Sequence, residues 1–526
     1  MNQNIKIIKK LSVGFVLLML FACGQNTEEA LAEYPQIYLD PTSRIIGQLA
    51  ENGKTESFLG VPFAKPPIGE LRWAPPKEML ILKGRKFHAS DFAPACMQAD
   101  RITKWYKNVV RGFGGNPEVI KAPAISEDCL YLNIWRPKTL GVSDQALPVV
   151  VYIHGGSNKA GWSYEPNYIG SNMAEEGVIV ISIAYRLGVF GYFSHPEFDH
   201  SNFGLLDMVE ALRWINRNIE AIGGDSERIT LMGESAGAGN IDYLMAIPSS
   251  EGLFSRAIHQ SSGSAIFNLS TKEDHSTLGV ELEKTLLVDQ TENISDRLIK
   301  LPADRILTAA EQVYEGHYFD NAVDGKSVFE PLMETIKNKK LHTVELLIGS
   351  NQHESLMYLD ENLSSEDWLE TQVSPKSKIN FLPLLDQLAS DRDKLNLLTT
   401  AQSFTCPALR LAKEFSMMGG SSWVYYFTRQ RQGEMAASMG AYHGAELPYV
   451  FDTHDDWLPT VEADRKLTSI MQDYWISFIK NGNPNRNDMT HWPTYNLESS
   501  QIMMLGDNVL ASFHPSQIIC ELLDPS

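Results

Sequence analysis

Apolar runs and helical patterns alternate along the chain. Five short apolar runs predict strands buried on both faces, as in the centre of a parallel sheet, and they lie at 149–153, 178–185, 229–232, 346–349 and 423–427. Apolar residues recur at helical spacing over 205–219, and the stop signal Asn481-Gly482-Asn483-Pro484 ends a second predicted helix over 466–480. The segment 271–340 is expected to be mostly helical and to lie over the sheet as an insertion. Because strands alternate with helices and no Pro/Ser-rich linker divides the chain, the pattern predicts one large α/β domain.

The junction after the third predicted strand carries the strongest chemical signal. The strand at 229–232 runs into Gly233-Glu234-Ser235-Ala236-Gly237, and a helix-compatible stretch at 241–245 follows. A serine at the apex of a tight strand-to-helix turn is the nucleophile elbow of α/β-hydrolases, and glycines on either side let strand and helix cross closely. The motif alone also arises by chance in long chains, but its strand and helix context makes Ser235 a candidate nucleophile.

The first 22 residues are typical of an export signal. Three lysines precede an apolar stretch that is too short to span a bilayer. Its end, Leu20-Phe21-Ala22-Cys23-Gly24, resembles a bacterial lipobox, in which Cys23 would be lipidated and become the first residue of the mature protein. The alternative is a plain secretory signal with an incidental cysteine. We expect 23–34 to form a lipidated N-terminus with a polar tether, and 35–526 to form the folded domain.

Charge and cysteine content narrow the class of partner. The 65 acidic and 45 basic residues give a net charge of −20, which argues against nucleic acid and against electrostatic docking on anionic lipid. Besides Cys23 the chain holds four cysteines, Cys96, Cys129, Cys406 and Cys520. An even number in an exported protein predicts disulfides, although three pairings are open and four free thiols are the alternative. No Cys/His cluster supports a metal site, and no organic cofactor is implied.

Three longer stretches resemble known family motifs, in addition to the elbow. They are Phe58-Leu59-Gly60-Val61-Pro62-Phe63-Ala64, Ser126-Glu127-Asp128-Cys129-Leu130-Tyr131-Leu132-Asn133-Ile134 and Asn202-Phe203-Gly204-Leu205-Leu206-Asp207. Together they resemble the type-B carboxylesterase family, which includes the cholinesterases. The resemblance covers nearly the whole mature chain. It implies an α/β-hydrolase fold with a large, mostly parallel central sheet, flanking helices and helical insertions. It also implies a serine hydrolase that cleaves carboxylic esters of small molecules through an acyl-enzyme on Ser235.

The resemblance supplies the partners of this serine, in the chain order nucleophile, acid, histidine. His443 lies in a stretch that resembles the histidine loop of the family and would act as general base. Glu354 follows the strand at 346–349 and would hold the histidine in its working tautomer. Asp324 is a runner-up for the acid. Glu234 is either an electrostatic modulator or only the variable position of the elbow. A neutral histidine base predicts activity that rises through about pH 6.5.

The turn after the strand at 149–153 provides the expected oxyanion hole. The strand runs into His154-Gly155-Gly156-Ser157, so the backbone N–H groups of Gly156 and Ser157, with that of Ala236, are the expected donors. Many relatives carry a third glycine where this chain has Ser157. A backbone donor survives this change, but a positive φ at a serine would be strained.

The resemblance also implies that Cys96 pairs with Cys129 and Cys406 with Cys520. In cholinesterases a tryptophan shortly before the second cysteine of the first loop binds a quaternary ammonium. Residues 119–127 contain no aromatic side chain, so a choline-ester specialist is not expected.

Two alternatives to a simple esterase remain open. The same machinery could act on an amide, a lactone or a bulky aromatic ester. A non-catalytic, cholinesterase-like binding or adhesion protein is disfavoured, because such proteins typically lose the serine or the histidine and this chain keeps Ser235, Glu354 and His443. The sequence does not predict the oligomeric state.

Overall fold

The computed structural model describes residues 34–79, 84–138, 145–286, 294–433, 435–496 and 498–523. The predicted export signal, Cys23 and the tether up to residue 33 lie outside the described residues. Among the helices of the described part, none combines the length and the apolar character needed to cross a bilayer.

A sheet of 11 strands forms the centre of the described part, in the order β16-β15-β14-β13-β12-β11-β9-β10-β8-β4-β3. The strands from β15 to β10 in this order run parallel to their neighbours. These are β9 (Leu147–Ile153), β10 (Ile179–Ile183), β11 (Gly224–Glu234), β12 (Arg256–Gln260), β13 (Glu345–Asn351), β14 (Ser422–Phe427) and β15 (Gln501–Leu505). All five predicted strands are therefore present, and the mostly parallel centre of the sheet is confirmed.

Antiparallel strands that the hydrophobic pattern did not predict complete both edges of the sheet. One edge is formed by β8 (Tyr131–Pro137), β4 (Thr55–Pro62) and β3 (Gln48–Leu49), and the other by β16 (Val509–Phe513). Two small sheets flank them, made of β1 (Gln36–Tyr38), β2 (Arg44–Ile46) and β5 (Lys86–His88), and of β6 (Ala95–Cys96) and β7 (Ile125–Ser126).

Apolar side chains cover both faces of the sheet. Val149, Val151 and Ile153 of β9 join one hydrophobic cluster, while the intervening Val150 and Tyr152 join another on the opposite face. Successive residues of a strand point to opposite faces, so an uninterrupted apolar run is what a strand with two covered faces requires.

Helices supply this cover. The predicted helices are α5 (Phe203–Ile222) and α17 (Glu462–Asn481), which end where Gly223 and Gly482 take φ values of 95° and 71°. The others outside the two helical insertions are α2 (Arg101–Gly112), α3 (Ser171–Glu175), α4 (Gly188–Tyr192), α6 (Ala236–Leu244), α14 (Cys406–Met417), α15 (Ala436–Met439), α16 (Leu447–Phe451) and α18 (Gln517–Leu523).

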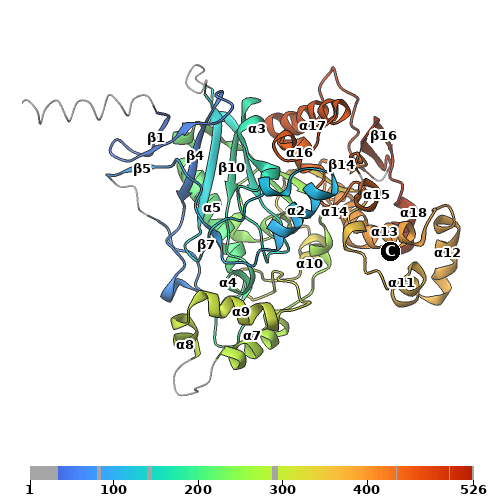
Figure 1. Cartoon of the computed structure of the whole chain (residues 1–526), viewed down its shortest axis with the longest axis horizontal. Coiled ribbons are helices and arrows are strands. Elements are labelled where there is room, and N and C mark those ends of the chain that lie inside the picture. The colour runs from blue at the N-terminus through green and yellow to red at the C-terminus, as the bar shows by residue number, and fades with distance from the viewer. Residues whose placement is uncertain are drawn as a thin grey trace, which may run out of the picture.

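Two groups of helices extend from the sheet. The predicted helical insertion comprises α7 (Lys272–Leu286), α8 (Ile294–Lys300), α9 (Ala303–Val313) and α10 (Leu332–Lys337). Figure 1 shows α7, α8 and α9 gathered at one end of the molecule rather than across the face of the sheet. The second group, which the sequence analysis missed, comprises α11 (Ser365–Gln372), α12 (Pro375–Leu385), α13 (Asp391–Thr400) and the π-helical turn Ala401–Thr405.

Two disulfides join segments that are apart in the sequence. Cys96 is bonded to Cys129 and Cys406 to Cys520, the pairing that the resemblance implied. The second bond fixes α18 to the first residue of α14, which directly follows the π-helical turn. Helix α18 also packs on α12, and its Ile519 enters a small separate core made by α11, α12 and α13.

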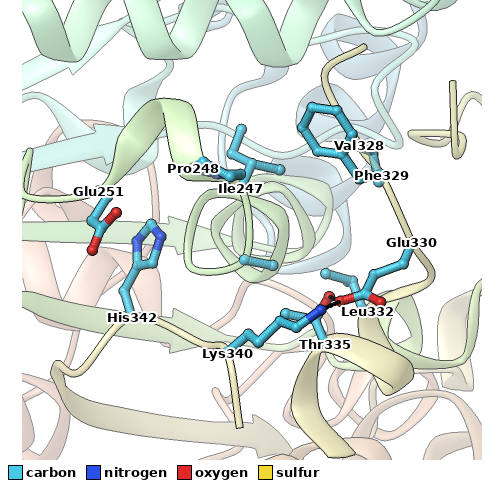
Figure 2. Close-up of a pocket in the computed structure, with 11 residues that line it drawn as sticks. Ile247, Pro248, Glu251, Val328, Phe329, Glu330, Leu332, Thr335, Lys340 and His342 are labelled. Atoms are coloured by element: carbon cyan, nitrogen blue, oxygen red, sulfur yellow. Dashed lines mark hydrogen bonds and ion pairs between the residues drawn. The ribbon is translucent and has the colours of Figure 1, made fainter. Parts of the chain in front are cut away.

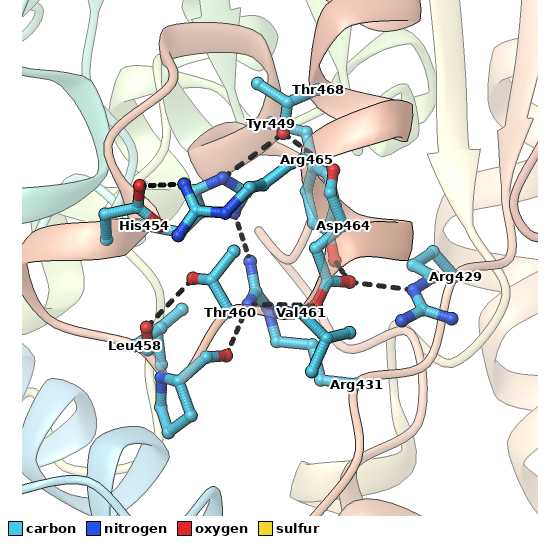
Figure 3. A network of polar contacts seen from close by, with 12 residues as sticks. Arg429, Arg431, Tyr449, His454, Leu458, Thr460, Val461, Asp464, Arg465 and Thr468 are labelled. Carbon is cyan, nitrogen blue, oxygen red and sulfur yellow. Dashed lines mark hydrogen bonds and ion pairs between the residues drawn. The ribbon is translucent and has the colours of Figure 1, made fainter.

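A buried polar network fastens the segment that leads from α16 into α17 (Figure 3). Asp464 accepts hydrogen bonds from Arg429 Nε at 2.8 Å and from the Tyr449 hydroxyl at 2.7 Å. Arg431 Nη2 lies 2.7 Å from His454 Nδ1. An arginine can only donate, so His454 must accept and therefore be neutral. Burial, and then the charge of Arg431, lower the pKa of His454 to about 4, which agrees with this geometry.

Candidate active site

The predicted elbow is formed between β11 and α6. Ser235 takes φ 56° and ψ −127°, a backbone conformation that an L-residue adopts only under strain. Its N–H donates to the carbonyl of Gln260 on β12 at 2.9 Å, which holds the turn against the sheet. A Cβ at Gly237 would lie 2.1 Å from the carbonyl oxygen of Ile153, so the crossing of helix and strand requires glycine there.

Two residues from distant parts of the chain form a line with this serine. The Ser235 hydroxyl oxygen lies 2.8 Å from His443 Nε2. On the other side of the ring, His443 Nδ1 lies 2.7 Å from Glu354 Oε2. The sequence analysis had chosen these three residues, and the structure brings them into one hydrogen-bonded line. Because a carboxylate can only accept, Nδ1 carries a proton, and Nε2 of the neutral ring is free to accept from the serine.

A second buried carboxyl group supports this line. Glu354 is fully buried, and its Oε1 accepts from the N–H of Asn351 at 2.6 Å. The side chain of Asn351 donates to Glu446 Oε2 at 2.5 Å and to the carbonyl of Tyr442 at 2.8 Å. Glu446 also accepts from Gln260 at 2.9 Å. Asn351 thus ties the loop that carries Glu354 to the loop that carries His443, a role that the sequence analysis did not assign.

The charge environment favours the protonated histidine. Glu234 Oε1 lies 3.2 Å from His443 Nε2, on the same side as Ser235. Burial favours the neutral ring, but the charge of Glu234 and then the hydrogen bond and charge of Glu354 outweigh it, so the pKa of His443 is raised. Burial, with the charge of Glu446, raises the pKa of Glu234 as well. These contacts therefore shift the pKa of His443 upward from the unperturbed value near 6.5 that the sequence analysis used.

The turn after β9 lies directly against the elbow. A Cβ at Gly155 would come within 3.0 Å of the Cβ of Ser235. Gly156, Ser157 and Asn158 all have positive φ, at 100°, 59° and 54°. In the part of the chain that the structure describes, the N–H groups of Gly156, Ser157 and Ala236 donate no hydrogen bond to another backbone group. These N–H groups therefore remain available to an anion beside Ser235, and the strain anticipated at Ser157 is present.

Aromatic rings surround the histidine. The Phe404 ring, from the π-helical turn, lies 5.1 Å from the imidazole, and the Tyr358 ring lies 6.3 Å from it. Trp105 of α2 packs on Tyr442 at 5.9 Å. The sequence analysis did not single out Phe404 or Tyr358. A π-helical turn interrupting helices is frequent at functional sites, but the sequence carries no simple signal for it.

Asp324 and His353 have local structural roles. Asp324, the runner-up acid, accepts from the backbone N–H groups of its own loop at Lys326, Ser327 and Val328. His353 Nδ1 accepts from the N–H of Ala441 at 3.0 Å, and so supports the histidine loop.

A separate cavity of about 370 Å³ lies between the loop after α6 and the start of α10, lined by residues from 246–251 and 328–335 with Lys340 and His342. Figure 2 shows Glu251 facing His342 on one side and the Lys340–Glu330 ion pair on the other. None of the residues that meet around Ser235 lines this cavity. Among the described residues, no three His, Cys, Asp or Glu side chains gather in a way that could hold a metal ion.

Comparison with known proteins agrees with this geometry. A profile of the carboxylesterase family matches residues 37–518. The para-nitrobenzyl esterase of Bacillus subtilis is 30% identical over 90% of this chain and 96% of its own length, and the fumonisin B1 esterase of Sphingopyxis macrogoltabida is 30% identical over 87% and 84%.

Solved structures give the same result. A para-nitrobenzyl esterase structure superposes with a TM-score of 0.79 at 28% identity and covers 94% of this chain and all of its own. A carboxylesterase of Geobacillus stearothermophilus superposes with a TM-score of 0.78 at 26% identity, over 93% of this chain and 100% of its own. The chain therefore belongs to the carboxylesterase family, with the α/β-hydrolase fold, and is a carboxylic ester hydrolase.

Proposed function

We propose that the protein hydrolyses small-molecule esters through an acyl-enzyme on Ser235, with His443 as general base and Glu354 as the acid of the triad. The observation that carries the proposal is the continuous line of hydrogen bonds from Ser235 through His443 to Glu354, at 2.8 and 2.7 Å. Both distances are within the range that proton transfer to a positioned base requires. The intact triad also speaks against a purely binding role.

In the proposed first step, Ser235 Oγ attacks the ester carbonyl carbon while His443 Nε2 takes its proton. The carbonyl oxygen becomes anionic and accepts from the N–H groups of Gly156, Ser157 and Ala236. His443 then returns the proton to the alcohol oxygen as the carbon–oxygen bond breaks, which leaves the acyl group on Ser235. A water molecule, deprotonated by the same histidine, repeats the sequence and releases the acid.

A covalent label combined with matched variants tests the mechanism. A fluorophosphonate should label Ser235 and no other serine, and Ser235→Ala should lower kcat by about 10⁶-fold. Glu354→Gln should lower kcat strongly in a folded protein, because the amide no longer fixes the histidine tautomer. An adduct on a different serine, or near-normal activity of Ser235→Ala, would contradict the proposal.

The rings around His443 indicate the shape of the substrate. Phe404 and Tyr358 border the imidazole from segments outside the central sheet, so an ester with an apolar or aromatic group would bury that group against them. A series of p-nitrophenyl esters with graded acyl length, extended by benzoyl and naphthoyl esters, would measure this preference. Preference for acetyl over every larger acyl group would exclude such burial.

We further propose that the mature protein begins at lipidated Cys23 and is held at the surface of a bacterial envelope membrane. Support comes from the lipobox-like end of the predicted export signal. Two disulfides are consistent with an exported protein, because such bonds persist in oxidising compartments.

A further inference from the structure

Three buried asparagines join the turn after β9, helix α6 and the loop before α10. The Asn158 amide donates through Nδ2 to the carbonyl of Phe319 at 2.8 Å. Asn240 Nδ2 donates to Asn158 Oδ1 at 2.8 Å, and Asn321 Nδ2 donates to Asn240 Oδ1 at 2.7 Å. The three residues are 4%, 1% and 2% exposed, so the chain of amides is shielded from solvent.

The direction of every amide in this chain is fixed. The Phe319 carbonyl can only accept, so the amide nitrogen of Asn158 must face it and its oxygen must face Asn240. Asn240 must then present its nitrogen to Asn158 and its oxygen to Asn321. Asn321 is held in place through its backbone carbonyl, which accepts from the Asn268 side chain at 2.8 Å and from the Tyr243 hydroxyl of α6 at 3.3 Å.

The positions of these residues connect them to the site. Asn158 directly follows Ser157, and Asn240 lies four residues, or about one helical turn, after Ala236. The bond between Asn240 and Asn158 therefore links the turn that carries the Gly156 and Ser157 amides to the helix that begins with the Ala236 amide.

The turn needs such a link. Ser157 and Asn158 are consecutive non-glycine residues in the left-handed region, which side chains disfavour. Asparagine tolerates this conformation better than most residues, and the Asn158 carbonyl also accepts from the N–H of Gly188 at 2.7 Å. The side-chain amide adds the bond that fixes this turn against α6.

We infer that Asn158, Asn240 and Asn321, here called the asparagine relay, are positioning residues that set the spacing of the oxyanion hole. The inference rests on the proposed function, since it needs an oxyanion beside Ser235. Donors in such a hole act by being held in place before charge develops, and displacements below 1 Å reduce their effect. Loss of the Asn158–Asn240 bond should therefore weaken stabilisation of the transition state more than binding of the ester.

Four variants test the inference. Asn240→Ala removes the central amide, and Asn158→Gly removes the terminal amide while glycine keeps the left-handed backbone without strain. The double variant shows whether the two share one function. Asn202→Ala is the matched control, because the Asn202 side chain is hydrogen-bonded to Ala322 and Ser327 of the same loop, and none of its side-chain hydrogen bonds to described residues goes to α6 or to the turn after β9.

We expect each relay variant to lower kcat by about 10- to 100-fold with KM within about threefold. Affinity for a trifluoromethyl ketone, which Ser235 converts to an anionic tetrahedral adduct, should fall in parallel with kcat. The double variant should be no slower than the slower single variant, because both lose the same bond. Asn202→Ala should lower the thermal midpoint without changing kcat.

An unchanged kcat and unchanged ketone affinity in Asn158→Gly would overturn the inference, and so would an equal loss of kcat in Asn202→Ala. If Asn240→Ala does not fold, Asn158→Gly gives the same comparison from the turn. Fluorophosphonate labelling of Ser235 in the unaltered protein is measured first. Its failure would refute the proposed function, whereas labelling with no effect of the relay variants would refute only the relay.

Discussion

At the scale of single residues, Glu234 has the largest expected effect on the pH dependence. Its carboxyl lies 3.2 Å from His443 Nε2 and favours the protonated ring, which cannot act as a base. The rate should therefore rise with pH along a limb that lies alkaline of the ordinary histidine value of about 6.5. Glu234→Gln removes the negative charge, so the limb should move to lower pH. The measurement is kcat/KM against pH for both proteins.

A matched substitution separates this local effect from a general change of charge. Glu251→Gln also removes one carboxyl group, but Glu251 lines the separate cavity, away from the residues that meet around Ser235. It should leave the profile in place. A limb that stays fixed in Glu234→Gln, or moves equally in both variants, would show that Glu234 does not set the pKa of His443.

Ser157 offers a second test at this scale. Its φ of 59° places a side chain in the left-handed region, at a cost of about 1–2 kcal/mol, which exceeds the extra chain entropy that glycine loses on folding. Ser157→Gly should therefore stabilise the protein by about 0.5–1 kcal/mol while keeping the backbone N–H. Urea denaturation measures the gain, and Ser157→Ala, which keeps the Cβ, should show none. A less stable glycine variant would mean that the serine hydroxyl makes a contact worth more than the strain.

At the scale of elements, the strands and helices predicted from the sequence are those that a buried apolar run or a helical periodicity marks. The continuous runs in β9 and β10 identified strands covered on both faces, and Gly482 correctly ended α17. The edge strand β16 has an intermediate to exposed pattern that no apolar run announces. Its pairing with β15 depends on contacts between strands rather than on its own composition.

The missed helices α11 and α13 did carry a local signal. The side chain of Ser364 accepts from the backbone N–H of Asp367, and the Asp367 side chain accepts from the backbone N–H of Ser364. The side chain of Ser390 accepts from the backbone N–H of Asp393 at the start of α13. A serine followed three residues later by an acidic residue is a known helix start. The pattern was readable, but the helices are short and weakly amphipathic, and their small core forms only when α12 and α18 join it.

The two disulfides provide a prediction for these elements. The Cys406–Cys520 bond closes a separation of 114 residues and the Cys96–Cys129 bond one of 33, so the loop-closure estimate is about 5 and about 4 kcal/mol. Replacing both cysteines of a pair by serine should lower the urea midpoint more for the longer loop. Replacing Cys406 and Cys520 should also reduce activity, because Phe404 lies two residues before Cys406 and packs on His443. Equal effects of the two pairs on activity would argue against this coupling.

At the scale of the whole molecule, the candidate site unites segments that are far apart in sequence. Ser235 and His443 are 208 positions apart. The elbow context identified Ser235 in advance, whereas only the resemblance to a family motif identified His443. Asn351, Glu446 and the asparagine relay were not predicted, because each acts through a side-chain contact between distant segments. A single sequence shows residue types but not which of them the backbone brings within 3 Å.

The overall charge bears on how the protein would be held at a membrane. With 65 acidic and 45 basic residues, the chain is repelled by anionic lipid, so electrostatic attraction would not hold it there. The proposed anchor is therefore the lipid on Cys23. One acyl chain binds membranes only marginally. The export signal resembles those of bacterial lipoproteins, which carry several acyl chains on one cysteine.

Replacing Cys23 tests this anchor directly. The unaltered protein should stay with the membrane fraction in high salt, because salt screens charge but does not weaken hydrophobic insertion. Cys23→Ser should move it out of that fraction while leaving the kcat of the exported domain unchanged, since Cys23 precedes the whole described domain. Intact-mass measurement of the native protein gives the decisive value. An N-terminus at another residue, with no lipid mass on Cys23, would refute the anchor and would leave the ester hydrolase intact.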